Sequence, residues 1–113
     1  MIKKIAPVVV GCATLFALLP ASAQDDGVVA PDPALFEQGQ AIYDANCVGC
    51  HQPGGVGLDP VFPALNGNEI LTDLDLIIGN IAHGRGAMPA FPDLTATDIA
   101  AVLTYIRNAW DND

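Results

Sequence analysis

The residues of this 113-residue chain best suited to chemistry lie together in one short segment, Cys47-Val48-Gly49-Cys50-His51. The order C-x-x-C-H is the attachment pattern of a c-type haem. Two residues between the thiols place both sulfur atoms at the vinyl groups along one edge of a porphyrin, where they form thioethers. The adjacent His51 then brings its imidazole to the iron as the proximal axial ligand. The pattern therefore predicts one covalently bound haem c.

Three other uses of the two cysteines are less well supported. A thioredoxin-like redox pair accompanies a βαβ pattern, and no such pattern is visible. A zinc site needs further ligands, and His83 is the single nitrogen ligand outside the motif. A disulfide that closes a loop of two residues would contribute little to stability.

A haem iron bound by His51 has a second axial position, for which the chain offers two candidates. Met88 lies in the Gly- and Pro-containing segment 84–91, which can hold a thioether against the iron outside any helix. His83 lies in the last turn of an expected helix, where a partly positive side chain suits the helix dipole. We expect Met88 to be the distal ligand and keep His83 as the alternative. Arg85 either contacts a haem propionate or remains a solvated loop residue.

The N-terminus has the features of an export signal. Lys3 and Lys4 precede the apolar run Ile5–Leu19, and the small residues 21–23 form a cleavage site of the Ala-x-Ala type. An apolar run of this length is shorter than the ~20 residues that span a bilayer. We therefore expect cleavage after Ala23, a periplasmic location and no permanent membrane span.

Cleavage divides the chain into a signal peptide (1–23), a polar tether (24–32) and one domain (33–113). It leaves two bases, Arg85 and Arg107, against 13 Asp and Glu, a formal net charge of −11. Nucleic acid is excluded as a partner, because phosphate binding needs clustered Lys and Arg. Such a small domain with long loops buries little apolar surface, so we expect a bound cofactor to complete its core.

The domain is predicted to be all-α, with three main short helices and long loops. Apolar spacing indicates a first helix from Pro33 to about Asn46, a second over residues 70–83 that ends at Gly84, and a third over residues 95–110. Segments 52–68 and 85–93 are rich in Pro and Gly and are expected to be loops.

Capping residues support the helix boundaries. Asp32 before Pro33 is typical of an N-cap. Thr72 with Asp75, and Thr95 with Asp98, have the spacing of capping boxes at the second and third helices. In the third helix we expect a buried stripe with Tyr105 at its edge; its members are Ile99, Val102, Leu103, Ile106 and Trp110.

Several further segments occur in the order found in one known family. They are Gly39 and Tyr43, the motif at 47–51, Phe62-Pro63-Ala64-Leu65, residues 84–91 with Met88-Pro89, and Thr104-Tyr105-Ile106-Arg107. In these respects the chain resembles small monohaem cytochromes c from about Pro33 to Trp110. The resemblance implies a cytochrome c-like fold wrapped around the haem.

The same resemblance implies roles for particular residues. Gly39 and Tyr43 would pack against Val102 and Tyr105, where the first and last helices meet. The Pro63 carbonyl would accept the Nδ1 proton of His51 and orient its ring. The chain departs from many relatives in having no lysine after residue 4.

The expected function is one-electron transfer by an exported soluble cytochrome c that is not an enzyme. Filled His/Met coordination leaves no open site for a substrate. The alternative is a small subunit of an exported dehydrogenase or terminal oxidase, and a peroxidase-like or gas-sensing haem protein is less well supported. The acidic charge predicts redox protein partners with a basic docking surface.

Overall fold

The computed structural model describes residue 11 and residues 30–112. The expected signal peptide, apart from residue 11, and most of the expected tether lie outside the described residues. The elements are α1 (Pro33–Asn46), α2 (Val48–His51), η1 (Pro53–Gly55), η2 (Glu69–Thr72), α3 (Leu74–His83) and α4 (Ala96–Asn108). Over residues 30–112 the extended pairing is limited to two isolated bridges, Leu58 with Phe62 and Arg85 with Met88. The all-α prediction is confirmed.

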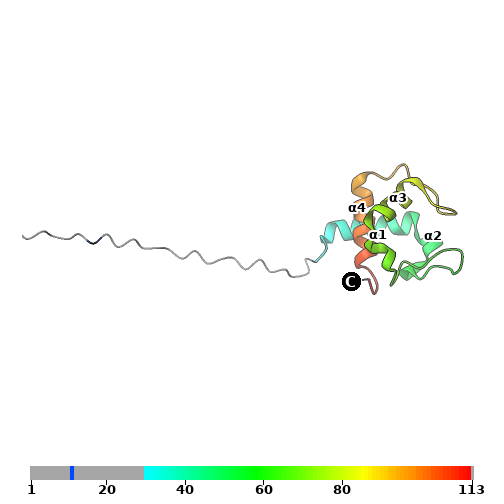
Figure 1. Cartoon of the computed structure of the whole chain (residues 1–113), viewed down its shortest axis with the longest axis horizontal. Helices are drawn as coiled ribbons and strands as arrows, with labels where there is room; N and C mark the ends of the chain where they lie inside the picture. The colour runs from blue at the N-terminus through cyan, green and yellow to red at the C-terminus, as the bar shows by residue number, and fades with distance from the viewer. Residues whose placement is uncertain (1–10, 12–29, 113) are drawn as a thin grey trace, which may run out of the picture.

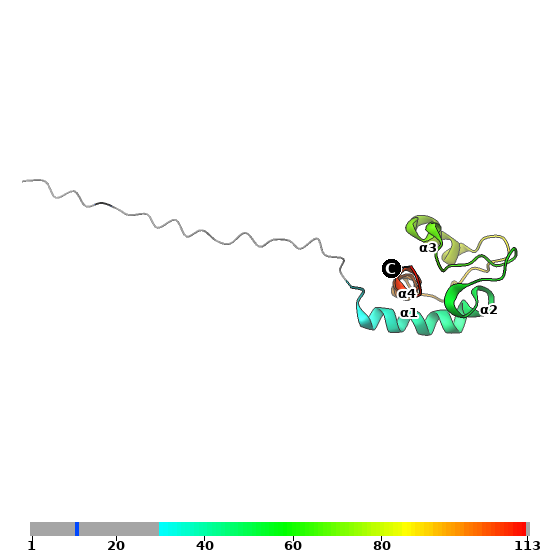
Figure 2. The ribbon, with the colours of Figure 1, turned by 90° about the horizontal axis from the view of Figure 1, so that it is seen from below.

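Helices α1 and α4 cross in direct contact and form the centre of the fold. Figure 2 shows α4 end-on between α1 and α3, and Figure 1 shows the same three helices in a view turned by 90°. The contact is close because Gly39 has no side chain: a Cβ there would overlap the Ala101 carbonyl and lie 2.8 Å from Cβ of Tyr105. Tyr43 packs on Tyr105, with ring centroids 5.5 Å apart. The expected packing of Gly39 and Tyr43 on the last helix agrees with this arrangement.

Helix α1 begins and ends where the sequence predicted. The Asp32 carboxylate accepts hydrogen bonds from the backbone N–H groups of Ala34 and Leu35, at 2.8 and 3.3 Å. Pro33 follows as the first helical residue, where its missing N–H costs nothing. The helix therefore starts with two of its free donors satisfied.

The start of α3 differs from the prediction. Thr72 belongs to η2, and its hydroxyl donates to the Glu69 carbonyl at 2.8 Å, so it does not cap α3. Asp73 is the N-cap instead, and its carboxylate accepts from the Leu76 N–H at 3.1 Å. The end is as predicted, because Gly84 adopts a positive φ of 76° at the C-cap.

The capping box of α4 is confirmed, and the expected positions of Tyr105 and Trp110 are corrected. Thr95 and Asp98 hydrogen-bond each other's backbone N–H groups, at 2.9 and 3.1 Å. Tyr105 is buried rather than at the edge of the stripe, with 8% of its surface exposed. Trp110 lies beyond the end of α4 with φ 61°, in the left-handed region.

Two short elements that the sequence analysis did not predict lie between α1 and α3. Helix α2 is a single turn that contains Cys50 and His51, and η1 follows it directly. Both are too short for a periodic apolar pattern. None of the helices in the described part of the chain is long and apolar enough to cross a membrane.

Candidate haem site

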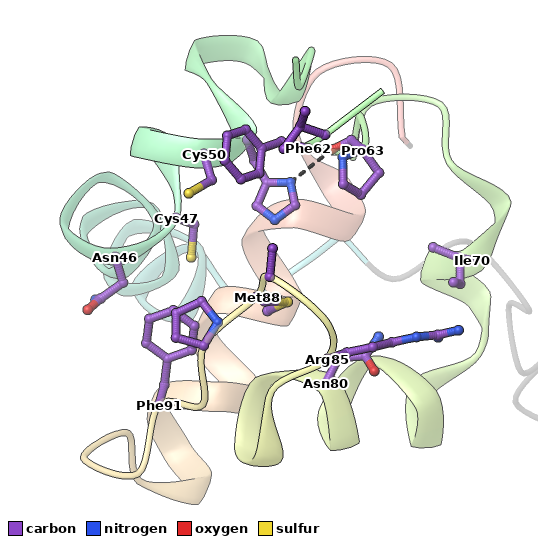
Figure 3. A pocket seen from close by; sticks show the side chains of 14 residues that line it. Asn46, Cys47, Cys50, Phe62, Pro63, Ile70, Asn80, Arg85, Met88 and Phe91 are labelled. Carbon is purple, nitrogen blue, oxygen red and sulfur yellow. Dashed lines mark hydrogen bonds between the residues drawn. The ribbon is translucent and has the colours of Figure 1, made fainter. Parts of the chain in front are cut away.

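A cavity of about 370 Å³ opens between α2, the loop that follows it and the loop after α3. All six residues that the sequence analysis singled out as site residues line this cavity, namely Cys47, Cys50, His51, Pro63, Arg85 and Met88. Figure 3 shows the cavity with ten of its lining side chains labelled. The structure thus brings together residues from three separate segments of the sequence.

A second cavity of about 170 Å³ shares Cys47, His51 and Met88 with the first and extends toward the core. Its inner wall is formed by apolar residues of α3 and α4, among them Ile81 and Val102. Two adjoining hollows with apolar walls and a few converging sulfur and nitrogen donors suit a large, flat, mainly apolar group. The residues present therefore fit a haem.

The two cysteines reach the cavity because α1 ends immediately before α2 begins. Cys47 is the C-cap of α1, and its N–H donates to the Tyr43 carbonyl at 2.8 Å. Cys50 lies in the single turn of α2, so both sulfur atoms lie on the same side of the cavity (Figure 3). Both thiols are free, so the alternative of a disulfide between them does not hold in this structure.

Burial, together with a smaller effect of the neighbouring Cys50, raises the pKa of the Cys47 thiol to about 11. Redox-active C-x-x-C cysteines show the opposite shift, because a stabilised thiolate is their nucleophile. The environment of Cys47 therefore argues against the thioredoxin-like alternative. Among residues 30–112 the structure shows no group of three His, Cys, Asp or Glu side chains that could hold a metal ion.

The His51 ring is held by the backbone of the loop that follows it. Its Nδ1 lies 2.9 Å from the Pro63 carbonyl oxygen, within hydrogen-bond distance. With its proton on Nδ1, the ring has a free lone pair on Nε2, which is the arrangement that metal-ligating histidines use. The His51 carbonyl accepts from the Gly57 N–H at 2.8 Å, so the backbone of the residue is fixed as well.

Gly57 allows the loop to fold back closely enough to place Pro63. It has φ 66°, and a Cβ there would lie 2.6 Å from the Pro63 carbonyl carbon. Only glycine combines this conformation with this close approach. The Pro- and Gly-rich composition of residues 52–68 therefore has a direct structural purpose.

Met88 is presented by a tight turn. The backbone N–H and C=O groups of Arg85 and Met88 bond to each other in both directions, each at 3.0 Å. Gly84 precedes the turn, and its Cβ would lie 2.8 Å from the Met88 carbonyl oxygen. Met88 is half-buried, and its side chain projects into the cavity (Figure 3).

Of the remaining candidates, Arg85 lies on the cavity and His83 does not. Arg85 is exposed and lines the larger cavity. His83 is the last residue of α3, is exposed, and is not among the residues that line either cavity. The structure thus places Met88, and not His83, together with His51.

Some lining residues escaped the sequence analysis. Asn80 and Ile70 both line the two cavities. Asn80 was detectable as a polar residue within the apolar stretch of α3, whereas Ile70 resembles any core residue in sequence. Tyr43 was expected only to pack, but its hydroxyl also donates to the Gln52 carbonyl at 2.6 Å. Burial raises the pKa of Tyr43 to about 12, so the phenol remains a proton donor at neutral pH.

Comparison with known proteins bears on the same residues. The sequence profile of the family described as "Cytochrome C oxidase, cbb3-type, subunit III" matches residues 34–106, which contain the whole cavity lining. The chain belongs to this family of c-type cytochromes. Its C-x-x-C-H motif is that of a covalent haem c, so this cytochrome binds one haem c, and its activity is electron transfer rather than catalysis.

Several curated proteins are similar to this cytochrome over most of its length. Cytochrome c6 of Cyanidium caldarium is 33% identical over 82 residues, covering 69% of this chain and 74% of the relative. Cytochrome c-552 of Thermus thermophilus is 36% identical over 89 residues, covering 64% and 67%.

A third relative is much longer than this chain. The cytochrome c subunit of the quinone-dependent alcohol dehydrogenase of Gluconobacter oxydans (strain 621H) is 31% identical over 107 residues. The match covers 80% of this chain but 22% of that subunit. Electron transfer requires a donor and an acceptor, so this cytochrome has redox partners.

Proposed function

We propose that Cys47 and Cys50 form the haem thioethers and that His51 and Met88 are the two axial ligands. The observation that carries this proposal is the presence of all four side chains on one cavity, with Nδ1 of His51 bonded to the Pro63 carbonyl. When bound, the haem supplies a one-electron Fe(III)/Fe(II) couple. The Pro63 carbonyl keeps the Nδ1 proton in place and strengthens the imidazole as a donor. The Met88 thioether would occupy the remaining coordination position on the iron and so keep substrates away from it.

Arg85 is proposed to bind a haem propionate. It is the cation on the cavity lining, and a guanidinium pairs with a carboxylate through two parallel hydrogen bonds. Arg85 lies in the turn that presents Met88, so a propionate bound by Arg85 would lie close to the proposed iron ligand.

The cellular role proposed is that of an exported, soluble electron carrier of the periplasm. The signal-like residues 1–23 support export, and residues 33–113 are then the functional domain. A chain with a formal net charge of −9 before cleavage attracts a partner with a basic surface. Exposed apolar side chains suit the small, short-lived contacts of redox partners: Val61, 61% exposed, lines the larger cavity, and Val56 and Leu58 lie in the same loop.

A second role is a subunit of a dehydrogenase or terminal oxidase. The family description and the Gluconobacter relative favour it, because both name subunits of larger enzymes. Affinity purification of the tagged chain from its native cells separates the two roles. A carrier is recovered alone at moderate salt, whereas a subunit is recovered with a stoichiometric enzyme.

The absorption spectrum of the haem-loaded chain tests the ligand set. We expect low-spin spectra in both oxidation states, with a weak far-red sulfur-to-iron band in the oxidised form. Met88→Ala should abolish that band, and His83→Ala, the matched control, should retain it. Low-spin iron without that band in the unmutated chain would instead assign the sixth position to His83. An unmutated protein that is high-spin would instead support the peroxidase-like or gas-sensing alternative.

Export is tested separately by the mass of the chain recovered from the periplasm. Cleavage after Ala23 predicts an N-terminus at Gln24 and a mass increase equal to one haem. A chain that keeps residues 1–23 would contradict the proposed export.

A further inference from the structure

The C-terminal turn is tied by side chains to the loop that carries Pro63. The Asn112 amide donates to the carbonyls of Leu65 and Ile106, at 3.0 and 2.7 Å, and accepts from the Gly67 N–H at 2.6 Å. A single side chain thus joins the end of α4 to the chain at positions 65 and 67. The ligand set proposed above does not include this contact.

A second pair reinforces the first. The Asn66 amide donates to the Asp111 carboxylate at 3.3 Å, and the Asp111 N–H donates back to the Asn66 amide oxygen at 3.2 Å. We call the contacts of Asn66, Asp111 and Asn112 the C-terminal clasp. It joins residues 45 to 47 positions apart in sequence.

Trp110 directs the chain into the clasp. Its φ of 61° is rare for a residue with a side chain and requires support from its surroundings. That support is the contact of its indole with Gly55, where an added Cβ would lie 2.7 and 2.8 Å from atoms of the indole ring. The Gly55 carbonyl in turn accepts from the N–H groups of Leu65 and Asn66, at 2.8 and 3.0 Å.

The clasp and the His51 hydrogen bond act on one short stretch of backbone. Leu65 is held at both of its polar groups, the carbonyl by Asn112 and the N–H by Gly55. Pro63 precedes it by two residues, and its own carbonyl lies 2.9 Å from Nδ1 of His51. The position of that carbonyl therefore depends on how firmly residues 65–67 are held.

We infer that Asn112 is a positioning residue for the haem site: by anchoring residues 65–67, it holds the Pro63 carbonyl on Nδ1 of His51 and so tunes the reduction potential. This inference rests on the proposed role of His51 as an axial ligand. When Nδ1 of the imidazole donates a hydrogen bond, the other ring nitrogen becomes a stronger electron donor to the iron. Stronger electron donation favours Fe(III). The clasp therefore lowers the potential.

The direction of the shift separates positioning from a general structural effect. If Asn112→Ala weakens the hydrogen bond from His51 to Pro63, the potential rises. If the change only loosens the fold and admits water to the haem, the potential falls, because water favours the more highly charged oxidised form.

The experiment uses the mature, haem-loaded chain with Asn112→Ala and the matched control Asn108→Ala. Asn108 is the last residue of α4, four positions before Asn112, and its amide donates within the helix, to the Thr104 carbonyl at 2.8 Å. The measurements are the reduction potential and, by NMR of the reduced protein, the exchange of the His51 Nδ1 proton with solvent. We expect Asn112→Ala to raise the potential and to speed exchange by about tenfold, the effect of losing hydrogen bonds of ordinary strength. Asn108→Ala should change neither.

An unchanged or lowered potential in Asn112→Ala, or unchanged proton exchange, overturns the inference. If that variant does not mature with haem, Asn66→Ala carries the test, because it removes the Asp111 pair and leaves Asn112 intact. It should shift the potential in the same direction by less, and no shift there overturns the inference as well. Failure of the proposed ligand set would be visible in the unmutated chain, as a spectrum without the far-red band.

Discussion

Tyr43 shows how a single buried side chain supports the backbone beside the haem site. Tyr43 has 1% of its surface exposed, yet its hydroxyl reaches the Gln52 carbonyl directly after His51. Gln52 has φ 67°, a conformation that costs free energy for a residue with a side chain. The buried hydroxyl therefore holds a strained backbone position next to His51, the proposed iron ligand.

Gly39 provides the sharpest test at this scale. Gly39→Ala places a methyl group against the Ala101 carbonyl and Cβ of Tyr105. Because backbone atoms cannot move aside cheaply, we expect a loss of roughly 1–3 kcal/mol in the free energy of unfolding, or more. Denaturant titration followed by circular dichroism of the haem-loaded chain measures it.

Gly79→Ala is the matched control for this substitution. Gly79 also lies inside a helix, α3, but an added Cβ there meets no atom within 4 Å. Alanine should stabilise that helix by about 0.5–1 kcal/mol. Equal effects of the two substitutions would show that helix propensity, rather than the close approach of α1 and α4, governs Gly39.

Among the elements, α3 and α4 show that the same spacing of Thr and Asp forms a capping box at one helix and not at another. Thr72 with Asp75 and Thr95 with Asp98 have the same spacing, but only the second pair forms a capping box. Thr72 is taken up by a 3-10 turn that brings Leu71 into the core. Asp73, one residue later, then becomes the first position from which a side chain can cap α3.

The capping box of α4 predicts a specific dependence on pH. Asp98 accepts from the Thr95 hydroxyl and N–H and from the Gln38 amide, and these bonds hold the pKa of its carboxyl below the usual value. A carboxyl with a depressed pKa in the folded state stabilises above its unfolded pKa and loses that contribution as the pH falls through the folded pKa. We expect Asp98→Asn to lower the thermal midpoint at pH 7.

The difference between Asp98→Asn and the unmutated chain should shrink as the pH is lowered below about 4. Asp93→Asn is the control, because it removes the same charge from an exposed residue outside the capping box. If Asp93→Asn lowers the thermal midpoint at pH 7 as much as Asp98→Asn does, the change in net charge rather than the loss of the cap is responsible.

At the scale of the whole molecule, the excess of acidic residues predicts the salt dependence of electron transfer. A cationic oxidant of high potential such as tris(1,10-phenanthroline)cobalt(III) should react with the reduced protein several-fold more slowly as the ionic strength rises from about 10 mM to 0.5 M. The anionic oxidant ferricyanide should show the opposite trend. Stopped-flow measurement of both rates checks the signs. Rates that rise with salt for the cation would exclude the proposed basic partner.

The second prediction at this scale concerns the core. The core has few buried apolar residues, and several of them, including Tyr43, Ile77 and Val102, also line the second cavity of about 170 Å³. Without haem this wall faces water, and the remaining burial cannot offset the conformational entropy of the long loops. We expect the double variant Cys47→Ser, Cys50→Ser to lose most of its helical circular dichroism. A haem-free variant that retains the helicity and a cooperative melt would contradict this expectation.

The features that the sequence determined by itself are those with local causes. The C-x-x-C-H motif, the ends of α1, the Gly84 stop and the capping box at Thr95 each depend on residues within a few positions of one another. Hydrogen bonds and helix geometry of that range follow from residue type and spacing.

Tertiary structure decided the features whose partners lie far apart in the chain. The capping of α3 by Asp73, the burial of Tyr105 and the hydroxyl contact of Tyr43 all depend on how helices and loops pack against one another. The clasp from Asn112 to Leu65 is the clearest case. No local pattern signals such a bond, because it exists only after α4 and the haem-site loop have been brought together by the core.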